Sequence, residues 1–123
     1  MELNEITGLI VDAAIEVHSG LGPGLLEEAY KQCLCEELLL RGLKVQTEVG
    51  LPVRYKSTIV DVGYRVDLVV EHSVFVELKA VHQLAPIHQA QLFTYLKLAD
   101  KPLGQLLNFN VRLMKNGIVR IKV

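Results

Sequence analysis

Apolar residues near the start of the chain recur every three or four positions, which is the spacing of a helix that buries one face. The recurring set is Ile6, Leu9, Ile10, Ala13, Ala14 and Val17. This pattern predicts a first helix with Asn4 as its N-cap. The stretch 20–24, Gly-Leu-Gly-Pro-Gly, should end it, because proline and glycine interrupt helices. A second, leucine-rich helix is expected from about Leu25 to Arg41, with Gly42 as its stop signal.

The rest of the chain reads as strands and turns with one further helix. Pro86 suits the first turn of that helix, which should run to about Ala99. Strands are expected at Val45–Val49, Leu51–Tyr55, Leu103–Phe109, Arg112–Met114 and Ile118–Val123. The last two flank 115–117, Lys-Asn-Gly, which has the composition of a hairpin turn. With one more hairpin between 64 and 80, the order is ααββββαβββ. This order predicts an α/β (α+β) fold with a mixed β-sheet flanked by helices.

The clearest alternation lies in that hairpin. Because side chains on a strand alternate between faces, one apolar face should collect Val66, Leu68, Val70, Val74, Val76, Leu78 and Ala80. A three-residue loop at 71–73 would then place Val70 opposite Val74 and Asp67 opposite Glu77. A two-residue loop would instead place Asp67 opposite Leu78 and mix the charged and apolar faces. The pattern therefore favours the three-residue loop.

Three charged residues interrupt these apolar strands, namely Asp67, Glu77 and Lys79. A buried charge is costly unless it is paired or bound to a metal ion. Opposed residues bring their Cβ atoms to roughly 5 Å, so two carboxylates could share one cation. Two acidic ligands with a lysine beside them are what a Mg²⁺-dependent phosphodiester-cleaving site requires. A surface salt-bridge cluster is the alternative interpretation.

Composition restricts the class of protein. The 123 residues, half of them hydrophobic, predict one globular domain over 1–123. Asp12 and Glu16 interrupt the best candidate for a membrane span, and the first residues carry no basic region before an apolar one, so a cytoplasmic location is expected. Cys33 and Cys35, two positions apart on a helix, should be reduced thiols.

Charge is divided unevenly along the chain although the net charge is only −1. Residues 1–42 carry two basic and eight acidic side chains, a net charge of −6. Residues 43–123 carry eleven basic and six acidic side chains, a net charge of +5. The sheet-bearing part could therefore attract a polyanion such as nucleic acid.

Several motifs in order resemble the PD-(D/E)XK nuclease superfamily, which has the restriction-endonuclease-like fold, and more closely its GxxExxY family. Gly24, Glu27 and Tyr30 supply the GxxExxY pattern. Asp67, Glu77-x-Lys79 and Gln91-x-x-x-Tyr95 follow in the order expected, although Val66 stands where the superfamily often has proline. The resemblance extends from the first helix to Phe109.

The resemblance implies roles for individual residues. Asp67, Glu77 and Glu27 would bind Mg²⁺ or Mn²⁺, together with the carbonyl oxygen of Leu78. Lys79 would position or deprotonate the attacking water, or neutralise the phosphate in the transition state.

The substrate-binding residues implied in the same way are Gln91, Tyr95 and Tyr30. Gln91 and Tyr95 are four positions apart and should share one helix face, as in RecB-type nucleases and lambda exonuclease. Tyr30 could equally be a core residue, and His18, just before the glycine-rich stretch, is a weaker site candidate.

The leading interpretation is a metal-dependent nuclease that acts on DNA, with RNA as the alternative substrate. A nucleic-acid- or protein-binding module that keeps the fold without turnover is the rival interpretation. A homodimer or a protein partner would be compatible with either.

Overall fold

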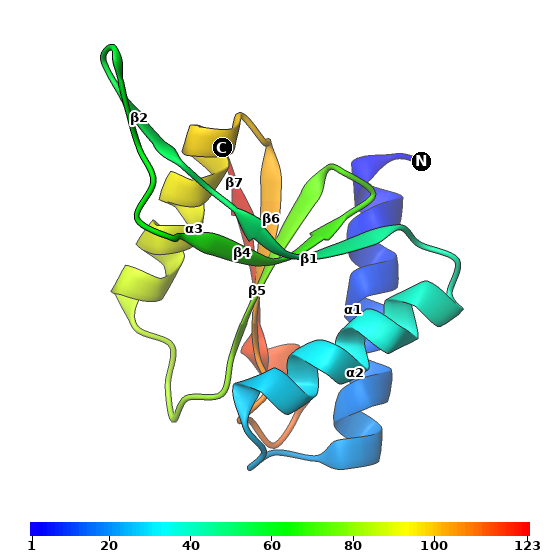
Figure 1. Cartoon of the computed structure of the whole chain (residues 1–123). Helices are drawn as coiled ribbons and strands as arrows, with labels where there is room; N and C mark the ends of the chain where they lie inside the picture. The colour runs from blue at the N-terminus through cyan, green and yellow to red at the C-terminus, as the bar shows by residue number, and fades with distance from the viewer.

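The computed structural model describes residues 1–123 as a mixed five-stranded sheet with helices on both faces (Figure 1). The helices are α1 (Leu3–Leu21), α2 (Glu27–Leu40) and α3 (Pro86–Ala99), with a 3₁₀ turn η1 (Met114–Gly117). The main sheet comprises β1 (Val45–Gly50), β4 (Arg65–Val70), β5 (Val74–Lys79), β6 (Leu103–Asn108) and β7 (Ile118–Lys122), in that order across the sheet. A separate hairpin joins β2 (Val53–Tyr55) to β3 (Thr58–Val60). This architecture confirms the predicted restriction-endonuclease-like fold.

The β4–β5 hairpin has the predicted register. Leu68 pairs with Val76, and Val70 pairs with Val74, so the connecting loop has three residues. β5 and β6 run parallel, with α3 as the crossover between them, whereas the other neighbours in the sheet run antiparallel. The start of α3 at Pro86 and its end at Ala99 also match the prediction.

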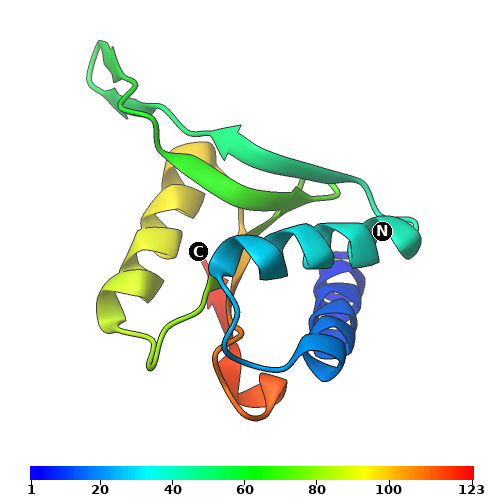
Figure 2. The same cartoon turned by 60° about the horizontal axis from the view of Figure 1, so that its bottom comes forward.

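The sheet lies between α1 and α2 on one face and α3 on the other (Figure 2). A layer of buried apolar side chains fills the space on each side. On the α1–α2 side, the buried residues include Ile10, Leu34, Leu68, Val76, Leu78 and Leu107. On the α3 side, they include Val69, Phe75, Leu92, Leu96, Leu106 and Ile121. Burial of these side chains is the main term that stabilises the arrangement of helices against the sheet.

The prediction that Val66 shares a face with Leu68 and Val70 is wrong. Val66 packs in the α3-side layer, and its partner Val49 contacts the same layer. The alternation breaks one position before Leu68, at Asp67, and at the facing Glu48, whose φ of +51° is not that of a regular strand. The side chains of β1 and β4 therefore switch sides of the sheet at Glu48 and Asp67. A strict alternation of side chains along each strand could not predict this switch.

Three local predictions are also corrected. α1 begins at Leu3 with Glu2 as its N-cap, so Asn4 lies inside the helix, where its side chain accepts a hydrogen bond from Arg120 at 2.7 Å. The β3 strand of the small hairpin had not been anticipated.

Residues 112–114 form no strand, because η1 occupies 114–117 and packs against the end of β6. A Cβ atom on Gly117 would lie 2.1 Å from the Asn108 carbonyl oxygen, so only glycine fits this approach.

None of the helices combines the length and the apolar character that crossing a membrane requires.

Candidate functional site

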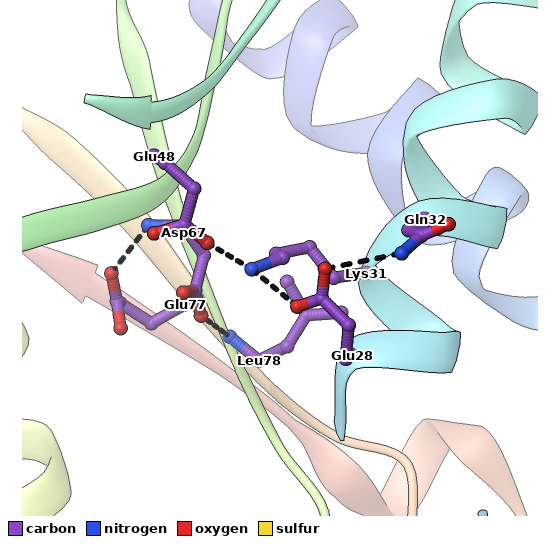
Figure 3. A network of polar contacts seen from close by, with 7 residues as sticks. All are labelled: Glu28, Lys31, Gln32, Glu48, Asp67, Glu77 and Leu78. Carbon is purple, nitrogen blue, oxygen red and sulfur yellow. Dashed lines mark hydrogen bonds and ion pairs between the residues drawn. The ribbon is translucent and has the colours of Figure 1, made fainter. Parts of the chain in front are cut away.

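The acidic residues of β4 and β5 lie where the two strands stop pairing through their backbones. Beyond the Leu68–Val76 pair, the backbone N–H of Asp67 donates to Glu77 Oε1 at 2.9 Å. The backbone N–H of Leu78 donates to Asp67 Oδ2, also at 2.9 Å. Figure 3 shows these two bonds side by side. The two carboxylates thus accept hydrogen bonds from backbone N–H groups that would otherwise pair with carbonyl oxygens of the neighbouring strand. The second oxygen of each carboxylate has no protein donor.

Glu77 is buried deeply, with 6% of its surface exposed. The pKa of its carboxyl group is raised to about 8, chiefly by burial and also by the negative charge of Asp67, against the opposing effects of the Asp67 N–H and Lys79. Burial also raises the pKa of Asp67, against the Leu78 N–H and the positive charge of Lys31. The fold therefore holds two carboxyl groups in a place where their combined negative charge is unfavourable.

Glu27, the first residue of α2, faces the same pair of acids. Burial raises its pKa, with Asp67 adding to the shift and Lys79 opposing it. The positive charge of Lys31 and the Ala80 backbone N–H also lower this pKa. The prediction that α2 delivers an acidic side chain to the Asp67–Glu77 pair has this electrostatic support.

No group of three or more His, Cys, Asp or Glu side chains is drawn close enough together to hold a metal ion. The chemistry of the oxygens nevertheless fits a hard cation. Asp67 and Glu77 each have one carboxylate oxygen that accepts no hydrogen bond from the protein. A divalent cation would stabilise the ionised forms of acids whose pKa values the apo site raises.

Lys31 and Glu48 also belong to the site, and the sequence analysis missed them. Lys31 forms salt bridges with Glu28 at 2.7 Å and with Glu48, beside Asp67 (Figure 3). Its positive charge lowers the pKa of both Asp67 and Glu27. Two signals could have found these residues: Lys31 lies one helical turn after Glu27, and Glu48 faces Asp67 once β1 is paired with β4.

Lys79 ends β5 beside the acids and forms no salt bridge with any of them. It lies next to Asn108 in the parallel β5–β6 pair. The Asn108 side chain is already hydrogen-bonded to the backbone of Val81. It accepts a hydrogen bond from the Val81 N–H at 3.1 Å and donates one to the Val81 carbonyl oxygen at 3.0 Å. The Lys79 ammonium group is therefore available to an anion that enters the site.

Tyr30 is a core residue whose hydroxyl bonds to the protein backbone. It is fully buried, and its ring stacks on Phe109 with centroids 4.7 Å apart. Its hydroxyl donates to the Gly22 carbonyl at 2.5 Å and accepts from the Leu25 N–H at 3.0 Å. The tyrosine of the GxxExxY pattern thus fixes the glycine-rich loop that leads into Glu27.

His18 has a structural role as well. It is buried, and its Nε2 lies 2.7 Å from the Val111 carbonyl oxygen, which ties α1 to the segment after β6. The position of His18 gives no support for a role in the site.

Gln91 and Tyr95 share one face of α3, as predicted. Both line a groove of about 400 Å³ between α3 and the residues around the β2–β3 hairpin, including Val53 and Tyr64. Burial raises the pKa of the Tyr95 hydroxyl, and the negative charges of Glu77 and Asp67 add to that shift. The groove therefore approaches the acidic pair from the α3 side of the sheet.

Comparison with known proteins gives one family and one distant structure. The model of the PD-(D/E)XK nuclease superfamily matches residues 4–121. A solved structure described as LHK-Exo in complex with dAMP has a TM-score of 0.46 and 13% sequence identity, covering 94% of this chain and 82% of its own. No curated protein matches the chain.

Proposed function

The chain belongs to the PD-(D/E)XK nuclease superfamily, and we propose that it is a metal-dependent nuclease that hydrolyses phosphodiester bonds in DNA, with RNA as the alternative substrate. The observation that carries the proposal is a pair of carboxylates, the half-buried Asp67 and the buried Glu77, at the end of two strands, next to a lysine with no salt-bridge partner. Within the superfamily, the GxxExxY family is the subgroup that we propose, because Gly24, Glu27 and Tyr30 fit its pattern.

The residues that would hold Mg²⁺ or Mn²⁺ are Asp67, Glu77 and Glu27, with the Leu78 carbonyl oxygen as a neutral ligand. Oxygen ligands of this kind suit both ions, and Mg²⁺ keeps several waters when few protein ligands are offered. When bound, the cation supplies positive charge to the phosphate and to the attacking water.

Lys79 provides the second charge that the chemistry needs. Its ammonium group can donate a hydrogen bond to the phosphate or hold the attacking water beside it, and either role stabilises negative charge that develops in the transition state. Gln91 and Tyr95 line the groove along α3, where they can donate hydrogen bonds to the backbone of the substrate strand.

Calorimetric titration with Mg²⁺ and Mn²⁺ tests the metal site. Asp67→Asn should weaken cation binding by roughly tenfold or more, because the ion loses a charged ligand. Asp61→Asn is the matched control: it removes a carboxylate that accepts only the Gly63 N–H in an exposed turn, so cation affinity should remain that of wild type. Lys79→Ala should keep cation affinity while it lowers the cleavage rate. Equal affinities in wild type and Asp67→Asn would contradict the assignment of the ligands.

A module that binds nucleic acid without cleaving it is the second candidate. Both carboxylates already accept backbone hydrogen bonds, and no three metal-binding side chains are gathered. A chain that binds DNA or RNA but takes up neither cation at millimolar concentration would favour this candidate.

A further inference from the structure

The hairpin of β2 and β3 projects from the body of the protein beside α3 (Figures 1 and 2). We call residues 51–65, which include this hairpin and its two connections, the arm. Its strands pair only with each other, through Val53–Val60, Arg54–Ile59 and Tyr55–Thr58. A two-stranded ribbon of this length is marginally stable by itself. Its exposed apolar side chains, Tyr55, Ile59 and Val62, are therefore available to a partner.

The arm forms one wall of the groove that holds Gln91 and Tyr95. The lining residues are Val53, Tyr64, Ile87, Ala90, Gln91, Thr94, Tyr95 and Leu98. Its volume of about 400 Å³ falls in the range of roughly 300–1,000 Å³ that is typical of pockets for small organic groups. The groove is thus large enough for a nucleotide unit.

Tyr64 stands at this groove with 45% of its surface exposed. Its ring centroid lies 6.0 Å from that of Tyr95, at an interplanar angle of 52°. The tilt leaves the Tyr64 ring available for a third ring to stack on it.

The two elements that form the groove carry charges that suit a polyanion, on side chains that lie outside the lining of the groove. The arm and α3 together carry four basic residues, Arg54, Lys56, Arg65 and Lys97, and one acidic residue, Asp61. The basic residues alternate with aromatic ones in Arg54-Tyr55-Lys56 and in Tyr64-Arg65, and the Lys56 ammonium lies 5.3 Å from the centroid of the Tyr55 ring. Basic side chains that follow a strand's phosphates, beside aromatic rings that stack on its bases, are the arrangement that binds single-stranded nucleic acid.

We propose that the groove between the arm and α3 holds an unpaired strand of the nucleic-acid substrate, with one base stacked on Tyr64 and the flanking phosphates, which leave the groove, held by the exposed Arg54 and Arg65 on the adjoining surface of the arm. Bases paired within a duplex cannot present their faces to Tyr64, so single strands and frayed ends are the favoured substrates. The cleavage that follows depends on the function proposed above, whereas binding of the strand does not.

Fluorescence of 2-aminopurine tests the stacking directly, and the absence of tryptophan from the chain leaves its signal free of that background. The probe is a single-stranded DNA of about 12 nucleotides with one 2-aminopurine, a length within the usual site sizes of single-strand-binding proteins, titrated in EDTA so that no strand is cut. Wild type and Tyr64→Phe should quench the fluorophore. Tyr64→Leu keeps an apolar side chain but loses the ring, so it should lose the quenching and bind roughly tenfold more weakly. A duplex with the same label should show no quenching.

If circular dichroism shows that Tyr64→Leu is unfolded, a second variant still tests the proposal. Arg54→Gln changes an exposed side chain, and it should weaken binding and reduce the slope of log K against log salt by about one. Unchanged affinity and salt slope in Arg54→Gln, or equal quenching by Tyr64→Phe and a folded Tyr64→Leu, would overturn the proposal.

Self-association through the groove is the competing outcome. Ile87 is 68% exposed beside the groove, and light scattering on wild type and Ile87→Glu would reveal a dimer that depends on it. A dimer lost in Ile87→Glu, with DNA binding unchanged, would overturn the proposal. Tyr64-dependent stacking without any cleavage in Mg²⁺ or Mn²⁺ would support it and refute the nuclease function. Cleavage of duplex DNA with no dependence on Tyr64 would support the nuclease function and overturn the proposal of strand binding in the groove.

Discussion

Replacing Glu77 with glutamine should stabilise the metal-free protein, and only at high pH. Glu77 has a pKa of about 8 in the folded chain against an ordinary value of 4.5. Because folding raises this pKa, the wild-type carboxyl group favours the folded state fully below about pH 4.5 and progressively loses that contribution as the pH rises through 8. Glu77→Gln cannot ionise, so its stability should not fall across this window on account of residue 77.

The difference in pKa sets the size of the effect. At about 1.4 kcal/mol per unit, the penalty for ionising Glu77 amounts to roughly 5 kcal/mol. The glutamine oxygen can still accept the Asp67 N–H, but its new amide donors need partners in a buried place, which costs on the order of 2 kcal/mol. We therefore expect Glu77→Gln to be more stable than wild type by about 3 kcal/mol above pH 8, or roughly 10 °C in Tm.

Thermal unfolding in EDTA, followed by circular dichroism between about pH 5 and pH 9, measures this difference. Asp61→Asn, which removes an exposed charge, is the control and should follow the wild-type curve. Saturating Mg²⁺ should restore the stability of wild type at the high end of the range and have little effect on Glu77→Gln. A gap between wild type and Glu77→Gln that is the same at every pH, or wild type more stable at about pH 9, would refute the reasoning.

Three further substitutions test the packing around the site, each by denaturant unfolding. Tyr30→Phe should cost about 1–3 kcal/mol, because the Leu25 N–H loses its acceptor and the Gly22 carbonyl loses its donor; no loss would mean that the hydroxyl does not hold the loop. Gly117→Ala should cost about 2 kcal/mol or more, since the added Cβ would collide with the Asn108 carbonyl, and a neutral result would contradict the close approach. Gln105→Leu should be neutral or stabilising by about 1 kcal/mol, because it removes a buried oxygen with no hydrogen-bond partner; a large loss would reveal an interaction that the structure lacks.

Elements with strong local signals could be predicted from the sequence. The β4–β5 register follows from the need to keep Leu68, Val70, Val74 and Val76 on one face, and it is confirmed. Pro86 defines the start of α3 through its fixed φ angle and missing N–H. In both cases a covalent or short-range constraint leaves one solution.

Features that depend on residues far apart in the chain could not be predicted in this way. Val66 changes face because Glu48, on another strand, and Asp67 interrupt the ladder together. Lys31 becomes part of the site only when α2 and β1 meet in space. The hydroxyl of Tyr30 bonds to a loop whose path depends on two glycines with a positive φ, Gly22 and Gly24, so its burial follows from tertiary structure rather than from the GxxExxY spacing.

Cleavage of labelled nucleic acid tests the central claim most directly. Purified wild type, Asp67→Asn and Lys79→Ala would be incubated with end-labelled single- and double-stranded DNA and RNA in Mg²⁺, Mn²⁺ or EDTA. We expect cleavage by wild type that requires Mg²⁺ or Mn²⁺, that stops in EDTA, and that falls by on the order of 100-fold in both variants. Intact substrates in every lane, or cleavage that persists in EDTA or in Asp67→Asn, would contradict this claim.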